Sequence, residues 1–378
     1  MSQSMKLIAV LPQGLEEEGA KELIELGAKS VVPKSRSVLF NADWSCFYRV
    51  HLCARLPFRF LREIAEFQCN SPESLYENVQ RAFDWKEWIH PSLSFRVDVS
   101  GSTYGLPSNH YSALQVKNAI IDVQRSYFGL RSNVNLDKPE FCIHLHLGGG
   151  KAALSFASST HSMHRRGFRP AMGLAPLKEN IAAGLIRATQ WNYSTPLIDP
   201  LCGSGTFLIE AVSIALGLQT GLKQSFLFEQ WLDFDSQLWA NEKEIVKQHL
   251  PKTNQLPLII GCEKNFDIAE QARINIAEAN LQSFIEVKNI HFGDLSLPDE
   301  KGILLCNPPY GKRLGNQNEL ELLYKELGIY CKTKASGWNL WLLSGNANLT
   351  KFLKMKATKR MPISNGGIDC RWLNYRIN

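Results

Sequence analysis

PLIDPLCGSGTFLIEA, residues 196–211, decides the fold class of this 378-residue chain. A short apolar strand is predicted to end at Asp199, a glycine-rich turn follows, and a helix is predicted to begin at about Thr206. The glycines let the backbone approach a ligand closely, and the helix N-terminus offers oriented N–H groups. Leu208 stands where the dinucleotide fingerprint has its third glycine, which counts against a nicotinamide enzyme, and no G-K-[ST] follows to make a P-loop. A tight βα turn that binds nothing is the alternative reading.

Residues 175–378, which contain this stretch, alternate helix-like and strand-like patterns. Short apolar strands between helices indicate an α/β fold with a mostly parallel sheet covered on both faces. The tail differs, because Asn365-Gly366 or Gly366-Gly367 between two strand patterns predicts an antiparallel hairpin. Residues 219–250 look like a helical insertion with its own aromatic packing. The predicted helices cover 176–191, 206–218 and 267–281, and the predicted strands cover 196–200, 257–263, 284–294, 302–309 and 339–346.

The chain ahead of this region divides into two further parts and a linker. Residues 1–65 interleave helix patterns with antiparallel strand patterns, which indicates a small α+β unit. Residues 66–160 contain a helix starting near Ser71 or Pro72, an alternating strand, a long helix, and two strands joined through glycines 148–150. A basic linker, residues 161–174, then leads into the α/β region 175–378.

Composition places the chain among ordinary globular proteins. With 44% hydrophobic and 21% charged residues, two or three domains are expected. No apolar run reaches the roughly 18 residues that a membrane span needs, and the N-terminus has no signal-peptide pattern, so we expect a cytoplasmic protein. The nine cysteines include no C-x-x-C pair, which argues against a disulfide framework and a Cys-rich zinc site. A net charge of +6 suits a polyanionic partner without proving one.

Two acidic residues are predicted at the same sheet edge as the glycine turn. Glu263 directly follows the apolar strand PLIIGC, where an acidic side chain can hold a ribose diol. Its distance from the glycine turn exceeds the usual ~20 residues. Asp294 ends the strand pattern FIEVKNIHFGD and could accept a hydrogen bond from an adenine amino group. A solvated carboxylate and a turn-forming Asp are the respective alternatives.

GILLCNPPYGKRLG, residues 302–315, carries the clearest chemical signal. Asn307, Pro308, Pro309 and Tyr310 follow an apolar strand. The two prolines stiffen the backbone and remove two N–H donors, which leaves the Pro308 carbonyl and the Asn307 amide oxygen as acceptors beside an aromatic ring. Such acceptors can hold the N–H bonds of an exocyclic amine, aim its lone pair at a methyl group and stabilise the developing positive charge. Tyr310 can stack on a base that has left its helix.

A pair of histidines raises the question of a metal site. His144 and His146 lie two apart in FCIHLHL and therefore share one strand face. No carboxylate or cysteine supports them as metal ligands, so we interpret them as polar residues on an exposed strand face and expect no metal.

These motifs resemble class I methyltransferases of the amino-methylating type. Nearly the whole chain is similar to the THUMP-domain RNA methyltransferases, in particular the bacterial 23S rRNA guanine-N2 methyltransferases often labelled N6-adenine-specific DNA methylases. Some of these relatives carry a second methyltransferase domain, whereas this chain ends after the first, so a single modification is expected. The shared motifs are KNAIIDVQR (117–125), HRRGFR (164–169), APLKENIAAGLI (175–186), DPLCGSGTFLIEA (199–211), NPPYGKRLG (307–315), LYKELG (323–328) and NGGI (365–368).

The resemblance implies a fold, a cofactor and a binding site. The fold would be a Rossmann-like methyltransferase domain over 175–378, after a ferredoxin-like segment over 1–65 and a THUMP domain over 66–160. The cofactor would be S-adenosylmethionine, and the target amine would sit at Asn307 to Tyr310. The implied cofactor-binding residues are Asp199, Leu201, Cys202, Gly203, Ser204, Gly205, Thr206, Glu263, Asp294, Leu295 and Asn307.

The implied partner is structured RNA, either 23S rRNA or a ribosomal precursor particle. Basic residues in the THUMP part and the linker would contact phosphates, which position RNA without reading its sequence. A solvated basic face is the alternative. Adenine-N6 methylation of DNA or RNA also stays open, as does a non-catalytic RNA-binding or assembly factor that has kept the fold. The expected RNA contacts are Lys117, Arg125, Arg131, Arg165, Arg166 and Arg169.

Overall fold

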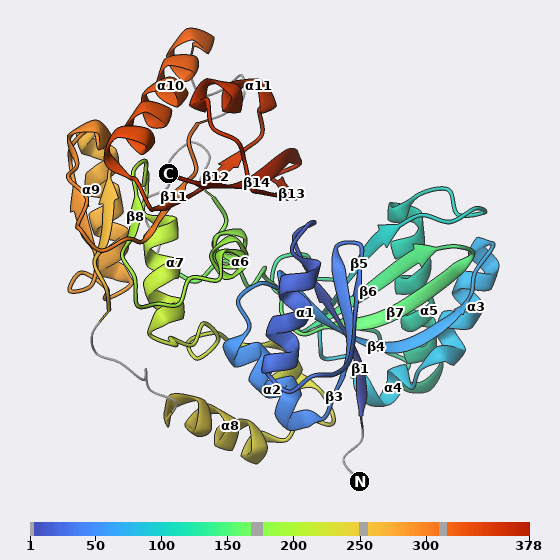
Figure 1. Ribbon diagram of the computed structural model, residues 1–378. Helices are drawn as coiled ribbons and strands as arrows, with labels where there is room; N and C mark the ends of the chain where they lie inside the picture. The colour runs from blue at the N-terminus through green and yellow to red at the C-terminus, as the bar shows by residue number, and fades with distance from the viewer. Residues whose placement is uncertain (1–3, 168–176, 249–255, 310–315) are drawn as a thin grey trace. The chain divides into compact units, whose positions relative to one another are not determined.

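The computed structural model describes residues 4–167, 177–248, 256–309 and 316–378 (Figure 1). The chain forms two compact units, which we describe separately. The N-terminal unit consists of Met1–Leu11, Ala20–Met163 and Thr220–Val246. The C-terminal unit consists of Pro12–Gly19, His164–Gln219 and Lys247–Asn378.

The N-terminal unit is built on one seven-stranded sheet in the order β2-β3-β1-β4-β7-β6-β5. All neighbouring strands are antiparallel except β5 and β6. Because β4 pairs with β1 on one side and β7 on the other, the predicted boundary between residues 65 and 66 falls inside this strand. The strands are β1 (Met5–Val10), β2 (Lys29–Lys34), β3 (Ser37–Ala42), β4 (Arg59–Gln68), β5 (Phe95–Gly101), β6 (Phe141–Gly148) and β7 (Lys151–Ala157).

The helix predicted to start near Ser71 or Pro72 begins there. Ser71 caps α3 in a capping box and Pro72 occupies the first turn, as expected for a residue whose missing N–H has no helical partner. The long helix α5 starts after the cap Ser108 and ends at Gly129, whose φ of +68° a glycine adopts without strain. The helices are α1 (Glu16–Glu25), α2 (Trp44–Cys53), α3 (Pro72–Ala82), α4 (Trp85–Trp88) and α5 (Asn109–Phe128).

The predicted insertion is helical and its first part belongs to the N-terminal unit. It forms η1 (Leu227–Gln230) and α8 (Ser236–Gln248). Phe228 is fully buried, with its ring centroid 5.1 Å from that of Phe47 and 5.5 Å from that of Tyr48 on α2. Trp239 of α8 packs against Tyr48 at 5.2 Å. The aromatic residues of the insertion therefore complete the core around α2.

The C-terminal unit contains a second seven-stranded sheet, in the order β10-β9-β8-β11-β12-β14-β13. The first five strands are parallel, and β14 pairs antiparallel with both of its neighbours, β12 and β13. The final hairpin turns through Gly366-Gly367, both at positive φ. This order confirms the predicted α/β class. The strands are β8 (Leu197–Asp199), β9 (Ile259–Cys262), β10 (Glu286–Lys288), β11 (Ile303–Cys306), β12 (Asn339–Ser344), β13 (Lys359–Asn365) and β14 (Ile368–Arg376).

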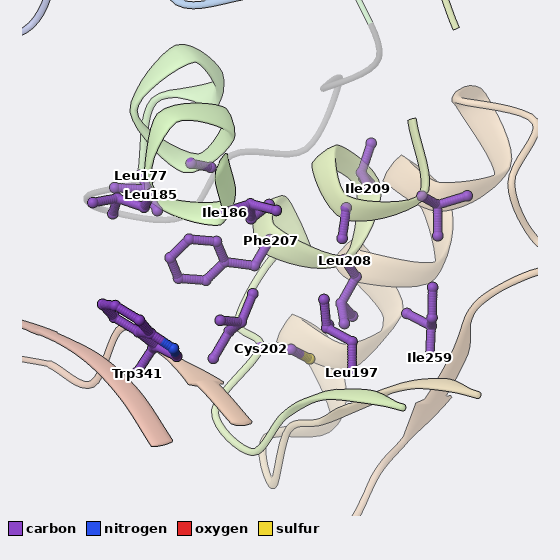
Figure 2. Close-up of a cluster of buried hydrophobic side chains, with 14 of the residues drawn as sticks. Leu177, Leu185, Ile186, Leu197, Cys202, Phe207, Leu208, Ile209, Ile259 and Trp341 are labelled. Carbon is purple, nitrogen blue, oxygen red and sulfur yellow. The ribbon is translucent and has the colours of Figure 1, made fainter. Parts of the chain in front are cut away.

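Helices cover both faces of this sheet, because strand side chains alternate between the faces. Leu197, Ile259 and Leu305 join the core under α6, α7 and α9, where Figure 2 shows Phe207 between Ile186 and Trp341. The neighbouring strand residues, such as Ile198, join the core under α10 and α11. The helices are α6 (Glu179–Thr189), α7 (Thr206–Ala215), α9 (Phe266–Glu278), η2 (Phe292–Asp294), α10 (Gln317–Lys334), α11 (Ala347–Thr350) and η3 (Lys351–Leu353).

One predicted strand is much shorter than expected. The pattern over 284–294 predicts a strand as far as Asp294, but β10 ends at Lys288. β10 ends level with its partner β9, since Lys288 pairs with Cys262, the last residue of β9. The next residue, Asn289, donates through its side-chain amide to the carbonyl oxygens of Glu263 and Lys264, at 2.8 and 3.2 Å. The residues that follow form the 3₁₀ helix η2 instead.

A short piece of the N-terminal sequence belongs to the C-terminal unit. Leu15 is fully buried in the core under α6 and α7. It lies against Gly184 so closely that a Cβ at that glycine would be 2.6 Å from Leu15 Cδ1. The Gln13 carbonyl accepts a hydrogen bond from the Ser364 N–H at 3.0 Å. Residues 12–19 are therefore a structural part of the α/β unit.

Candidate active site

The candidate site lies where the order of the parallel strands reverses. β8 is flanked by β9 on one side and β11 on the other, and the chain crosses the sheet in opposite directions from this point. In open α/β sheets, ligands bind outside the carboxyl ends of the strands at such a switch point. The three loops there carry Asp199, Glu263 and Asn307, each directly after or at the end of its strand.

The glycine turn after β8 has the geometry that close backbone approach requires. Gly203 and Gly205 adopt φ of +52° and +83°, a region that other residues rarely occupy. A Cβ at Gly203 would meet no atom within 4 Å among the described residues, so the turn has open space beside it. Gly205 is the N-cap of α7 and provides no side-chain cap. The turn is held from behind by the Asn275 amide, which donates to the Ser204 carbonyl at 3.1 Å.

Leu208 stands where the dinucleotide fingerprint has its third glycine. The space for its side chain is provided by Gly261 of the neighbouring strand β9. A Cβ at Gly261 in β9 would lie 2.5 Å from Leu208 Cδ1, 2.8 Å from Cys202 Sγ and 2.9 Å from Cys202 Cβ. Figure 2 shows Cys202 and Leu208 next to each other above the strands. The glycine that lets α7 pack closely on the sheet is therefore in strand β9 and not in the helix.

Asp199 is the most perturbed acid of the site. The residue is 2% exposed, and burial raises the pKa of its carboxyl to about 8, partly offset by the Leu201 N–H, which donates to Oδ1 at 3.0 Å. The negative charge of Glu263 adds to the rise of this pKa. A buried carboxyl beside a second acid favours a bound cation. The α-ammonium group of S-adenosylmethionine is such a cation, so these residues fit that cofactor.

Glu263 and Asp294 follow the carboxyl ends of β9 and β10, and their side chains differ in solvent exposure. Glu263 is half-buried, and its Oε1 accepts a hydrogen bond from the Asn265 N–H at 2.9 Å. Asp294 is exposed on η2, six residues beyond the end of β10, and its neighbour Leu295 is buried in the core under α10. The remaining cofactor candidates Cys202 and Thr206 are both buried within the turn.

Asn307 is the acceptor that the motif after β11 predicts. Its Oδ1 is buried and has no hydrogen-bond partner among the described residues. An unpaired buried acceptor costs about 1–3 kcal/mol, which a donor on a bound ligand would recover. Pro308 is buried and Pro309 half-buried beside it, and neither has an N–H that could take up the free acceptor. Tyr310 lies outside the described residues.

The basic residues expected to contact RNA have different environments. Arg125 and Arg131 are exposed, and Lys117 is half-buried on α5. In the linker, Arg165 is exposed, and Arg169 lies outside the described residues. The exposed side chains of Arg125, Arg131 and Arg165 are accessible to a phosphate.

Arg166 has a buried environment that the basic linker pattern does not predict. Its side chain is 4% exposed, and Nη1 lies 2.6 Å from Oε2 of Glu210, a residue of α7 that is fully buried. A guanidinium in a buried ion pair is not available to a phosphate. We therefore interpret Arg166 as a structural residue whose ion pair with Glu210 attaches the linker to α7. The signal in the sequence is Glu210 itself, an acid within the apolar helix TFLIEAVSIA.

The two histidines of β6 are not equivalent. His146 is exposed and its Nδ1 lies 3.0 Å from the Ser100 hydroxyl, as expected for an exposed strand face. His144 is largely enclosed, and burial lowers its pKa to about 4, so the exposed-face interpretation is wrong for this residue. Within the described ranges, no three His, Cys, Asp or Glu side chains are grouped as metal ligands would be.

The described part of the chain also has no helix with the length and apolarity to cross a membrane.

Comparison with known proteins identifies the domains of this chain and its relatives. Residues 166–374 match the RMKL-like methyltransferase domain, 69–157 the THUMP domain and 6–61 the RlmL ferredoxin-like domain. A Synechocystis protein, whose name assigns it provisionally to the RNA methyltransferases, is 38% identical over 98% of this chain and 96% of its own length. The ribosomal RNA large subunit methyltransferase K/L of Cellvibrio japonicus is 37% identical over 98% of this chain.

This chain spans only 51% of the length of the Cellvibrio protein, so the match covers about half of that relative. Among solved structures, SMU.472, provisionally described as a methyltransferase and crystallised with SAH (S-adenosylhomocysteine), is 28% identical. It superposes with a TM-score of 0.89 over 100% of this chain and 99% of its own. This confirms the predicted fold, and S-adenosylmethionine is the cofactor that the fold and the site fit. The chain belongs to the RMKL-like methyltransferases, with RlmL ferredoxin-like and THUMP domains ahead of the methyltransferase domain.

Proposed function

We propose that this chain methylates the exocyclic N2 amine of a guanine in large-subunit ribosomal RNA. The observation that carries the proposal is the buried Oδ1 of Asn307 at the carboxyl end of β11, which has no hydrogen-bond partner in the part of the chain that the structure describes. An exocyclic amine would supply an N–H donor to this oxygen. The choice of RNA is supported by the THUMP match, and the choice of large-subunit rRNA by the names of the K/L relatives.

In the proposed reaction, some residues of the site bind the cofactor and others position the target amine. S-adenosylmethionine supplies an electrophilic methyl group when bound. Asp199 would hold its ammonium group, and Glu263 its ribose. The Asn307 side-chain oxygen and the Pro308 carbonyl would each accept a hydrogen bond from one N–H of the amine. These two hydrogen bonds would direct the nitrogen lone pair at the methyl carbon and stabilise the positive charge that develops on nitrogen. No strong base is needed, because the methylated nitrogen readily loses its extra proton to water.

The RNA would be held by the exposed basic residues outside this site. Lys117, Arg125 and Arg131 of the THUMP domain, with Arg165 and Arg169 of the linker, are the proposed phosphate contacts. The proposed substrate is 23S rRNA or a ribosomal precursor particle. Arg166 is left out of this set because its side chain is buried against Glu210.

The test is methyl transfer to RNA from a strain that lacks the gene. Purified protein is incubated with labelled S-adenosylmethionine and total RNA of that strain, and the nucleosides are separated by mass spectrometry. We expect label in N2-methylguanosine of large-subunit rRNA. Label in N6-methyladenosine would retain the amine chemistry and replace the base. Cofactor binding without any label would favour a non-catalytic RNA-binding or assembly factor.

A further inference from the structure

The 3₁₀ helix η2 carries Asp294, the residue expected to accept a hydrogen bond from the adenine amino group of the cofactor. η2 is three residues long, and the Asp294 side chain is exposed. A single 3₁₀ turn has few internal hydrogen bonds, and their geometry is poorer than in an α-helix. The contacts that η2 makes with the rest of the unit therefore decide where the Asp294 carboxylate lies.

One side of α10 packs against η2. Glu326, Tyr330 and Lys334 are four residues apart, which places them on the same side of this helix. The Tyr330 ring contacts the Phe292 ring edge-on, with the ring centroids 5.6 Å apart, and both side chains are buried. Phe292 thereby anchors η2 in the core under α10.

Polar groups on the same side of α10 hold the backbone before and after Asp294. Lys334 Nζ donates to the Gly293 carbonyl oxygen at 2.7 Å, and the Tyr330 hydroxyl donates to the Leu295 carbonyl oxygen at 3.4 Å. One turn earlier, Glu326 Oε2 lies 3.6 Å from His291 Nε2. Both peptide neighbours of Asp294 are thus bound by α10, while its own carboxylate stays accessible to a ligand.

Lys334 differs from an ordinary lysine at the end of a helix. Lysines in the last turn commonly interact with the free carbonyl groups of their own helix, and α10 has two, Lys332 and Lys334. Lys334 donates to a carbonyl 41 positions earlier in the chain. Its ammonium group also lies 6.0 Å from the centroid of the Tyr330 ring. The Lys334 side chain is therefore directed at η2.

We propose that Lys334 is a positioning residue that sets the selectivity of the cofactor site for adenine. By holding the Gly293 carbonyl, Lys334 would keep the Asp294 carboxylate where it accepts a hydrogen bond from the adenine amine. Such a bond weakens steeply when its geometry is lost, so a looser η2 would lose selectivity for the amine before it loses the other cofactor contacts. This inference rests on the proposed function, since it concerns the cofactor of that reaction.

The experiment compares two ligands on the full chain by calorimetry. One is S-adenosylhomocysteine, and the other is its purine analogue, in which hydrogen replaces the exocyclic amine of adenine. We expect the wild type to prefer S-adenosylhomocysteine by about tenfold or more, the usual effect of a hydrogen bond to a charged group. Lys334→Met keeps the length of the side chain and removes the donor. It should reduce this preference by about threefold or more and leave the affinity for the purine analogue unchanged.

Three further variants separate positioning from general effects. Lys332→Met removes the other lysine of the same turn and should leave the preference at the wild-type value. Lys334→Arg retains a donor for the Gly293 carbonyl and should restore most of the preference. Asp294→Ala should abolish the preference, and adding Lys334→Met to it should change nothing more, because Lys334 acts through Asp294.

The outcomes distinguish this inference from the proposed function. An unchanged preference in Lys334→Met would overturn the inference. Equal losses of affinity for both ligands, with a lower melting temperature, would also overturn it and leave Lys334 a purely structural role. A wild type whose preference depends on Lys334 but that transfers no methyl group to rRNA would sustain the inference and refute the function.

Discussion

Asn307 is the residue on which the proposed amine chemistry depends. We predict that Asn307→Ala lowers methyl transfer by about 100-fold or more, the usual loss when a preorganised group that stabilises transition-state charge is removed. The affinity for S-adenosylmethionine, measured by calorimetry, should stay within a few-fold. The melting temperature should not fall, because the substitution removes a buried acceptor that has no partner among the described residues. Wild-type turnover in this variant would take Asn307 out of the mechanism.

Asp199 makes cofactor binding depend on pH. Its pKa of about 8 means that below this pH the carboxyl is mostly protonated in the cofactor-free protein, and a cationic ligand must ionise it in order to pair with it. We therefore predict that the affinity for S-adenosylmethionine rises by about tenfold between pH 6.5 and 7.5, since each pH unit changes the ionised fraction by about that factor. Asp199→Asn should bind more weakly and with no such rise.

The same shift predicts how stability changes without cofactor. Between the ordinary value of 3.8 and about 8, the unfolded chain has released the Asp199 proton while the folded chain retains it. The contribution of this group to the free energy of unfolding therefore falls as the pH rises through that window. Urea unfolding at pH 7.5 should show Asp199→Asn to be at least as stable as the wild type. A large destabilisation by this substitution would contradict the protonated, buried carboxyl.

At the scale of elements, α7 and β9 depend on the fit between Leu208 and Gly261. Gly261→Ala would place a Cβ within 3 Å of both Leu208 and Cys202 and should cost about 1–3 kcal/mol of unfolding free energy. Leu208→Ala removes a fully buried side chain and should cost about 2–5 kcal/mol. Because the second change makes room for the first, the double variant should lose less than the sum. Strict additivity in urea unfolding would show that the two residues do not share this space.

The elements of the α/β unit could be predicted because their patterns are local. The strand over 257–263 and the hairpin turn are encoded by apolar runs and adjacent glycines, and both are present as β9 and Gly366-Gly367. The predicted strand over 284–294 is too long, because its apolar pattern continues past Lys288. β10 ends at Lys288 because its partner strand β9 ends opposite it at Cys262, and this long-range pairing is not contained in any local pattern.

The site could be predicted in part for the same reason. The glycine turn and the Asn307 motif are each contiguous in sequence, so the chemistry of their residue types could be interpreted from the sequence alone. The pairing of Arg166 with Glu210 joins positions 44 apart, and the burial of Arg166 follows only from the tertiary fold. The basic linker pattern predicts phosphate contact for Arg166, because a charge pattern in a sequence does not distinguish an exposed arginine from a buried one.

At the scale of the whole molecule, the two units exchange segments of the chain. Residues 12–19 complete the α/β core through Leu15, and residues 220–246 complete the core around α2 through Phe228 and Trp239. A division by sequence regions assigns each segment to the other part, since a local pattern can mark an insertion, as it does for 219–250, without showing which core it completes. Neither unit is therefore a continuous stretch of sequence.

This exchange predicts that the chain cannot be cut between its units without loss of stability. A fragment of residues 1–163 would lack the aromatic residues that cover Phe47 and Tyr48, and a fragment of residues 164–378 would lack Leu15. We expect each fragment alone to bind a hydrophobic dye and to unfold at lower urea than the full chain, and co-expression to restore a complex. Leu15→Ala in the full chain is the point test, with an expected loss of about 2–5 kcal/mol. Fragments that fold separately with the stability of the full chain would show that the exchanged segments are dispensable, and the two units would then be independent domains.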